Sequence, residues 1–188
     1  MKKKTRENMR PKTWLRSITM KTKEILISGI AGTTFMTLFS YLVSLADGEN
    51  FSEPERLGQL ARRLVPKLGK QERLALGWLG HYGMGLLFAL VYVELWRKGK
   101  LKPDLKTNLW LGGLSGLLAV AVWKTTFKMH PLPPALSFNK YYLQLVPAHL
   151  VFTVFAGIGY QISKKINDGT AHPSSPDACG SPLNLIKA

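Results

Sequence analysis

Four long runs of apolar residues, separated by polar and basic connectors, dominate the pattern of this 188-residue chain. The first, 25–46, holds 22 residues without a formal charge, and a helix of that length at about 1.5 Å per residue crosses a hydrocarbon core of roughly 30 Å. The other three runs are 74–96, 109–127 and 141–162. This pattern predicts an all-α, polytopic membrane protein built as a four-helix transmembrane bundle.

The two ends of the chain differ from the apolar region between them. Residues 1–24 carry nine Lys and Arg and form a basic leader, whereas 166–188 are rich in Gly, Pro, Ser and Asp, which predicts a disordered tail. The alternative reading of the first apolar run is a secretory signal peptide cleaved near Ala46. Its 22 residues exceed the roughly 7–15 of a secretory apolar region, so we expect a retained helix and a transmembrane domain over 25–165.

A short amphipathic helix is predicted in the first connector. Ser52 can cap its N-terminus, Pro54 is tolerated in a first turn, and Glu55 can return the capping bond. Apolar residues then recur at helical spacing, opposite Arg and Gln: Leu57, Leu60, Ala61, Leu64 and Val65. We expect this helix to lie flat at the membrane interface.

The basic residues predict an orientation. The chain has 26 Lys and Arg against 11 Asp and Glu, a formal net charge of +15. Of these basic residues, 17 flank the apolar runs on the side of both termini and nine on the opposite side. Because Lys and Arg in short flanks are retained in the cytoplasm, we expect both termini there. Their clustering beside apolar runs favours anionic lipid headgroups as partners over nucleic acid.

No motif of a soluble enzyme is present, so no catalytic residue is predicted. The candidate intramembrane polar site is the pair His81 and His149, together with Tyr82 and Thr153. Both histidines lie about 10–12 Å from the same end of their runs, and no carboxylate is near either one in the sequence. Three interpretations stay open: a hydrogen bond across the bundle, for example to Thr33, Tyr82 or Gln144; a path for a proton or small solute; and ligation of haem or a metal.

Glycines recur along the predicted helices at spacings that place them on one face. Small residues allow helices to approach closely in lipid, where packing drives association. The predicted helix-packing positions are Gly77, Gly85, Gly112, Gly116 and Gly157. The same faces allow a homo-oligomer or contact with another membrane protein.

Two segments carry a resemblance to known proteins. The sequence GWLGHYGMGLLFA from Gly77 and the sequence AHLVFTVFAGIGY from Ala148 resemble the histidine-bearing second and fourth helices of small four-helix bacterial inner-membrane proteins of unknown function. The resemblance covers about a third of the chain. It implies a bacterial inner (plasma) membrane and no known activity.

These observations favour a structural or accessory membrane protein without a cofactor. The first alternative is a small transporter or proton-conducting subunit that uses His81 and His149. The second is a haem- or metal-binding membrane protein with the same two histidines as ligands.

Purified protein is expected to be colourless and free of stoichiometric metal, because two histidines are too few for a closed zinc site. His81→Gln and His149→Gln should each lower stability by about 1 kcal/mol, through loss of an interhelical hydrogen bond. Absorption spectroscopy, elemental analysis and thermal unfolding of the three proteins check this. A Soret band that disappears in either variant would instead identify a haem protein.

Overall fold

The computed structural model describes residues 11–133 and 135–171 of the chain, with side chains between 18 and 167. All of the regular structure in this part is helical. The five helices are α1 (Pro11–Asp47), α2 (Glu53–Leu64), α3 (Lys70–Arg97), α4 (Leu105–Met129) and α5 (Phe138–Ala171). Four of them, α1, α3, α4 and α5, are long and apolar enough to cross a membrane. The prediction of an all-helical chain with four long apolar helices is thereby confirmed.

The helices extend further than the predicted apolar runs. Helix α1 is described from Pro11, inside the predicted leader, and no helix breaker interrupts it before the apolar run. Helix α5 continues to Ala171, which includes the first residues of the predicted tail. Hydropathy marks only the apolar part of a helix, and a helix with polar side chains can continue beyond it. Residues 172–188, where the rest of the disordered tail is predicted, lie outside the described residues.

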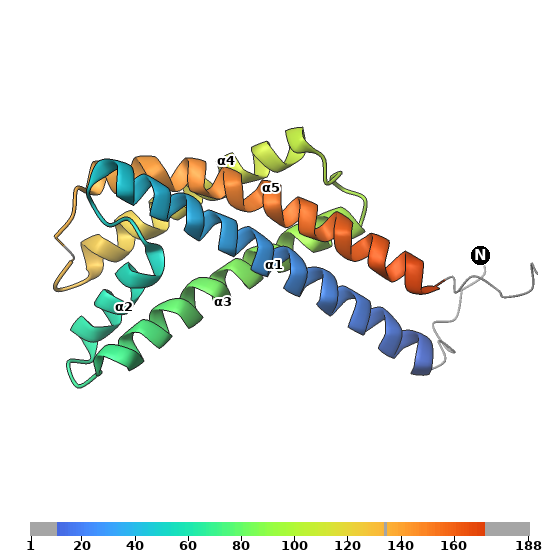
Figure 1. Ribbon diagram of the computed structural model, residues 1–188, viewed down its shortest axis with the longest axis horizontal. Helices are drawn as coiled ribbons and strands as arrows, with labels where there is room; N and C mark the ends of the chain where they lie inside the picture. The colour runs from blue at the N-terminus through green and yellow to red at the C-terminus, as the bar shows by residue number, and fades with distance from the viewer. Residues whose placement is uncertain (1–10, 134, 172–188) are drawn as a thin grey trace, which may run out of the picture.

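The four long helices do not form a symmetric bundle (Figure 1). Helices α1 and α5 run side by side in opposite directions, α4 packs on α5, and α3 crosses α1. The short α2 packs against α3 at the end where α1 finishes and α3 and α5 begin, which we call the α2 end. Within the described residues α3 and α4 form no packed pair. The bundle is therefore incomplete on the side between these two helices.

Glycines allow the close approach of α4 to α5. A Cβ on Gly112 would lie 2.7 Å from the Cα of Leu150, and one on Gly116 would lie 2.8 Å from the Cα of Val146. Real side chains do not come so close to a backbone, so any larger residue would push the two helices apart. The other predicted packing glycines also face a neighbouring segment: Gly77 faces Pro54, Gly85 faces Thr33, and Gly157 faces Asn108.

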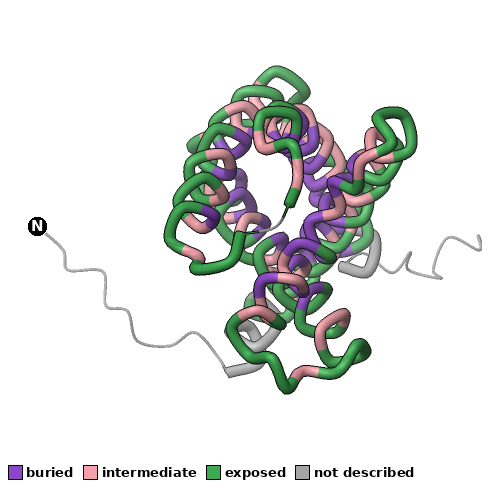
Figure 2. Tube along the Cα trace, turned by 90° about the vertical axis from the view of Figure 1, so that its left-hand side faces the viewer, coloured by how far each residue is buried: buried purple, intermediate pink, exposed green. Residues whose placement is uncertain are grey.

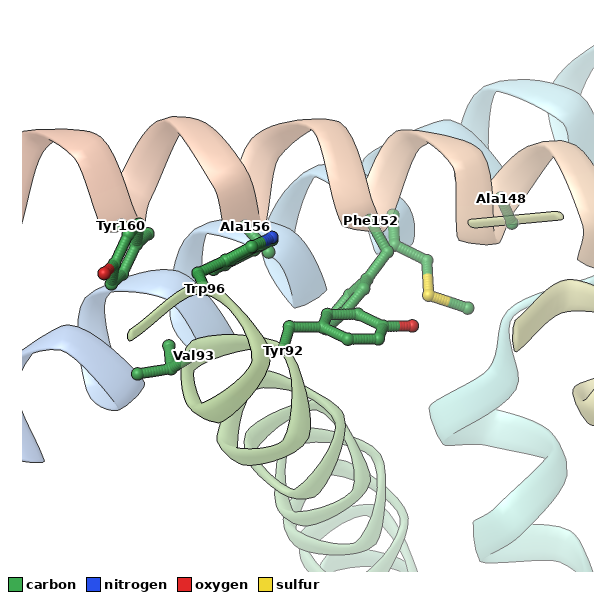
Figure 3. Packing of buried hydrophobic residues seen from close by; sticks show 8 residues of the cluster. Tyr92, Val93, Trp96, Ala148, Phe152, Ala156 and Tyr160 are labelled. Atoms are coloured by element: carbon green, nitrogen blue, oxygen red, sulfur yellow. The ribbon is translucent and has the colours of Figure 1, made fainter. Parts of the chain in front are cut away.

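Helix α3 reaches α5 through large rings rather than through close backbones. Tyr92 and Trp96 of α3 point toward Phe152, Ala156 and Tyr160 of α5 (Figure 3). The ring centroids of Tyr92 and Phe152 are 6.0 Å apart, and those of Trp96 and Tyr160 are 5.1 Å apart. Buried residues lie on the inward faces of the helices and exposed residues on their outer faces (Figure 2). This aromatic cluster fixes the C-terminal half of α3.

The predicted helix in the first connector is present as α2, but its details differ from the prediction. Ser52 makes no side-chain capping bond, and Glu55 accepts a hydrogen bond from the side chain of Asn50 instead. Leu64, on the predicted apolar face, is 62% exposed. The buried residues are Glu53, Pro54, Arg56, Gly58 and Leu60. Pro54 and Gly58 face α3, whereas Glu53 bonds to side chains of α1 and α5. The position of α2 at a membrane interface stays a prediction.

Gly116→Ala tests the α4–α5 contact, with Gly113→Ala as the matched control on the same helix. The added Cβ at 116 collides with the α5 backbone, so this variant should be destabilised by about 1–3 kcal/mol. A Cβ at 113 meets nothing within 4 Å, so Gly113→Ala should be neutral or more stable by up to about 1 kcal/mol through helix propensity. Thermal unfolding in detergent measures both, and equal stabilities would contradict the described packing.

Candidate functional site

A cavity of about 300 Å³ occupies the incomplete side of the molecule. Helices α1 and α5 form its floor, α3 and α4 form its walls, and α2 closes one end; we call it the α3–α4 cleft. Its lining is almost entirely apolar. Met84, Leu118 and Val122 line it and are 47%, 54% and 50% exposed, so the cleft opens outward between α3 and α4.

The cleft results from how α3 is held. Helix α3 packs on α1 and α2 but not on α4. Aromatic side chains lie between its C-terminal half and α5 and keep the two backbones apart. Ala119 on α4 lines the gap with a small side chain, which leaves space unfilled. The side chains that line such an apolar space lack dispersion contacts on that side, so a ligand that fills the space can stabilise the protein.

The structure brings together the two histidines that the sequence singled out. His81 of α3 and His149 of α5 both line the cleft, and both side chains are buried. The other two candidate polar residues do not belong to it. Tyr82 shares a hydrogen bond of 3.0 Å with Thr34 on an exposed face, and the Thr153 hydroxyl donates to backbone carbonyls of its own helix.

The hydrogen bond of His81 determines which of its nitrogens carries the proton. His81 Nε2 lies 2.9 Å from Thr37 Oγ1, and the Thr37 hydroxyl donates its single hydrogen to the carbonyl of Thr33 at 2.8 Å. Thr37 Oγ1 must therefore accept from an Nε2–H. In the neutral imidazole, Nδ1 of His81 is left with a lone pair.

The same argument gives the opposite tautomer for His149. Its Nδ1 lies 2.8 Å from the backbone carbonyl of Leu145, and a carbonyl oxygen can only accept, so Nδ1 carries the hydrogen. Nε2 is then the nitrogen with a lone pair. His81 thus bonds across the bundle to α1, whereas the bond of His149 stays within α5, contrary to the expected interhelical bond. Neither histidine bonds to Gln144. In their neutral forms both histidines keep one acceptor nitrogen on a ring that lines the cleft.

A carboxyl group, Glu53, also lines the cleft, and sequence reasoning missed it. Glu53 is 2% exposed; its Oε1 accepts hydrogen bonds from Ser40 Oγ at 2.9 Å and from Gln144 Nε2 at 3.2 Å. Its Oε2 is buried without a hydrogen-bond partner. Burial raises the pKa of Glu53, because desolvation outweighs the hydrogen bonds that favour the ionised form.

Two further polar side chains lie near Glu53 without pairing with it. Arg56 is buried, and it donates to the carbonyl of Asn50 and, at 3.0 Å, to Gln59 Oε1. No ion pair joins Arg56 to Glu53 in the part of the chain that is described. The Tyr141 hydroxyl is buried without a hydrogen-bond partner. The α2 end therefore holds a carboxyl group that no cation neutralises.

Glu53 was not predicted as a site residue because it lies in a connector. A short helix between two apolar runs was expected at the membrane surface, where a glutamate needs no partner. One signal was available: Phe51 and Pro54 flank Glu53, and an apolar neighbourhood is unusual for a solvated carboxylate. Phe51 is 2% exposed and packs with Tyr141 and Leu145 of α5, which draws the start of α2 into the molecule.

The residues of the cleft do not form a metal site. Among the described residues, no three His, Cys, Asp or Glu side chains converge closely enough to hold a metal ion. The far end of the molecule is held by ion pairs instead: Arg97 pairs with the buried Glu24 at 2.7 Å, and Glu94 pairs with Lys21 and, at 3.3 Å, with Lys98. These pairs tie the start of α1 to the end of α3.

Comparison of the chain with known protein families, with curated proteins and with solved structures found no match. The resemblance to small four-helix inner-membrane proteins therefore stays a prediction, and the arrangement of the cleft is the starting point for a function.

Proposed function

We propose that this chain is a multi-pass protein of the bacterial inner membrane that binds a small, largely apolar molecule in the α3–α4 cleft. The observation that carries this proposal is the cavity of about 300 Å³, which lies within the size range of ligand pockets. Its apolar walls suit an apolar ligand. Because it opens sideways between two long helices, a molecule dissolved in the bilayer can enter it directly.

The outer surface of the helices supports a lipid environment. Large apolar side chains point outward along the long helices, among them Leu79 at 71%, Leu117 at 62% and Leu143 at 76% exposed. A soluble monomer rarely exposes apolar side chains over so much of its surface. Lipid tails cover such a surface without cost, since they are as apolar as leucine.

The arrangement of charges supports an orientation with both termini in the cytoplasm. The α2 end then faces the periplasm, and the end with the Glu24–Arg97 ion pair faces the cytoplasm. The basic residues near that end suit contact with anionic lipid headgroups.

Cysteine labelling tests this orientation. The single native cysteine, Cys179, should react with a membrane-impermeant maleimide only after the cells are permeabilised, because the C-terminus is proposed to be cytoplasmic. Lys67→Cys, at an exposed position between α2 and α3 and combined with Cys179→Ser, should react in intact spheroplasts. The reverse pattern would invert the orientation, and reaction of both cysteines in intact spheroplasts would contradict a spanning topology.

A carrier role and a structural role make different demands on the cleft. A structural or accessory protein needs no occupant there, whereas a carrier or transporter must bind its cargo reversibly. The role of a carrier or transporter is favoured, because ionisable groups inside a bundle commonly mark a binding or conduction path. Three such groups, Glu53, His81 and His149, are buried and line this cavity.

Filling the cleft tests whether it binds. Ala119 lines the cleft, and Ala119→Phe should weaken binding of the neutral dye Nile red at least about tenfold, which corresponds to about 1.4 kcal/mol. Ala121→Phe, on the exposed face of the same helix, adds the same ring outside the cleft and should bind like the wild type. Dye fluorescence titrations of the proteins in lipid nanodiscs measure the affinities.

Leu118→Trp provides a second blocking variant if Ala119→Phe does not fold. Leu118 lies at the mouth of the cleft and is 54% exposed, so a larger ring there leaves the core intact. If the dye binds saturably and neither blocking variant weakens its binding, the dye binds outside the cleft. If the wild type shows no saturable binding, the proposed ligand-binding function is wrong and the structural role is left.

A further inference from the structure

The ionisable side chains of the cleft leave three atoms without a recorded partner in the described residues, and all three can accept hydrogen bonds. They are Oε2 of Glu53, Nδ1 of His81 and Nε2 of His149. No Lys or Arg lines the cavity. The polar part of the cleft therefore suits a donor or a positive charge, and it holds no positively charged side chain that could bind a carboxylate or phosphate.

The apolar walls add a second feature that suits a cation. Phe88, Trp123 and Phe152 line the same cavity, on α3, α4 and α5. The faces of aromatic rings attract cations, and clusters of rings bind quaternary ammonium groups in proteins. Three rings and an unpaired carboxyl group on one apolar cavity form a site for a cation that also carries hydrocarbon.

We propose that the cleft binds a lipophilic ammonium ion, whose charged head lies beside Glu53 and whose hydrocarbon part fills the space between α3 and α4. This inference rests on the proposed function, and it adds the chemical class of the ligand. An inorganic cation is disfavoured, because the three acceptors do not converge into a closed coordination shell. A zwitterionic or anionic lipid is disfavoured by the absence of a positively charged side chain in the lining.

Proton release accompanies the binding of this ligand. Because burial raises the pKa of Glu53, the empty cleft holds a neutral carboxyl group over a wider pH range than a solvated glutamate would. An ammonium ion stabilises the ionised form. Where the empty cleft holds Glu53 neutral, binding of the cation therefore releases the proton of Glu53, and the affinity for the cation rises as the pH increases through the raised pKa.

Other groups near Glu53 have to be separated from this effect. The neighbours are Arg56 on α2, Tyr141 on α5, and the two histidines across the cleft. Arg56 donates to the carbonyl of Asn50 and to Gln59, and it does not line the cavity. Protonation of His81 or His149 would also repel a cation at low pH, and a variant at Glu53 distinguishes the two sources.

The test compares two amphiphiles with the same hydrocarbon chain, the cation dodecylammonium and the neutral 1-dodecanol. Each competes with Nile red on the full chain in nanodiscs of phosphatidylcholine, which carries no net charge. Dodecylammonium should displace the dye at a concentration at least about tenfold lower than 1-dodecanol. Its affinity should increase with pH, and the affinity of 1-dodecanol should not.

Glu53→Gln should remove both the preference for the cation and its pH dependence while Nile red still binds. Glu55→Gln is the matched control, because Glu55 lies two residues along the same helix, is exposed and bonds only to Asn50. It should behave as the wild type does. If Glu53→Gln does not fold, calorimetry of the wild type in buffers of different ionisation enthalpy measures proton release on binding over roughly pH 5–8.

Each result distinguishes this inference from the proposed function. Equal affinities for dodecylammonium and 1-dodecanol would overturn the ammonium site but leave a cleft that binds apolar molecules. A cation preference that survives in Glu53→Gln would overturn the role of Glu53. A pH dependence that survives unchanged in this variant would assign it to His81 and His149 and overturn the proton exchange at Glu53. If the wild type releases no proton on binding dodecylammonium between roughly pH 5 and 8, the exchange of the Glu53 proton for the cation is wrong. Loss of saturable Nile red binding by the wild type would overturn the proposed function itself.

Discussion

The close contact of α5 with both α1 and α4 determines the geometry of the rest of the molecule. Glycines at this contact bring α4 within backbone distance of α5, and Gly32 and Gly159 do the same between α1 and α5. Helix α3 is left to cross α1 and to reach α5 through Tyr92 and Trp96. In lipid no hydrophobic force closes the remaining gap, because a lipid tail fills it as well as a helix does. The space between α3 and α4 is therefore a consequence of which faces carry small residues.

The first connector adds chemistry to this space. Phe51 anchors the start of α2 among residues of α5, so Glu53 enters the bundle next to Ser40 and Gln144. A buried carboxylate without a counter-ion is costly, and the protein limits this cost by hydrogen bonds to one oxygen and by favouring the neutral form. The second oxygen of Glu53 keeps no partner. A group held in this way is sensitive to any charge that enters the cleft.

The two histidines line the same cavity and carry their hydrogen on different ring nitrogens. His81 donates from Nε2 and His149 from Nδ1, so each ring is fixed by a bond to its surroundings and keeps the other nitrogen as an acceptor. Both bonds hold the rings in place without a metal. Fixed acceptors, one acidic group and apolar walls together suit the proposed recognition of a molecule by its charge and its hydrocarbon content.

The sequence alone determined the four long apolar helices and the short helix in the first connector, and it singled out His81 and His149. These features follow from local patterns, because the length of an apolar run and the spacing of residues along one helix need no knowledge of its neighbours. It did not determine that Tyr82 bonds to Thr34 outside the cleft, that α2 buries Glu53 and Arg56, or that α3 and α4 stay apart. Tertiary packing decided these points. Which helix faces approach each other depends on contacts between residues far apart in the chain, such as Gly77 with Pro54 and Glu53 with Gln144.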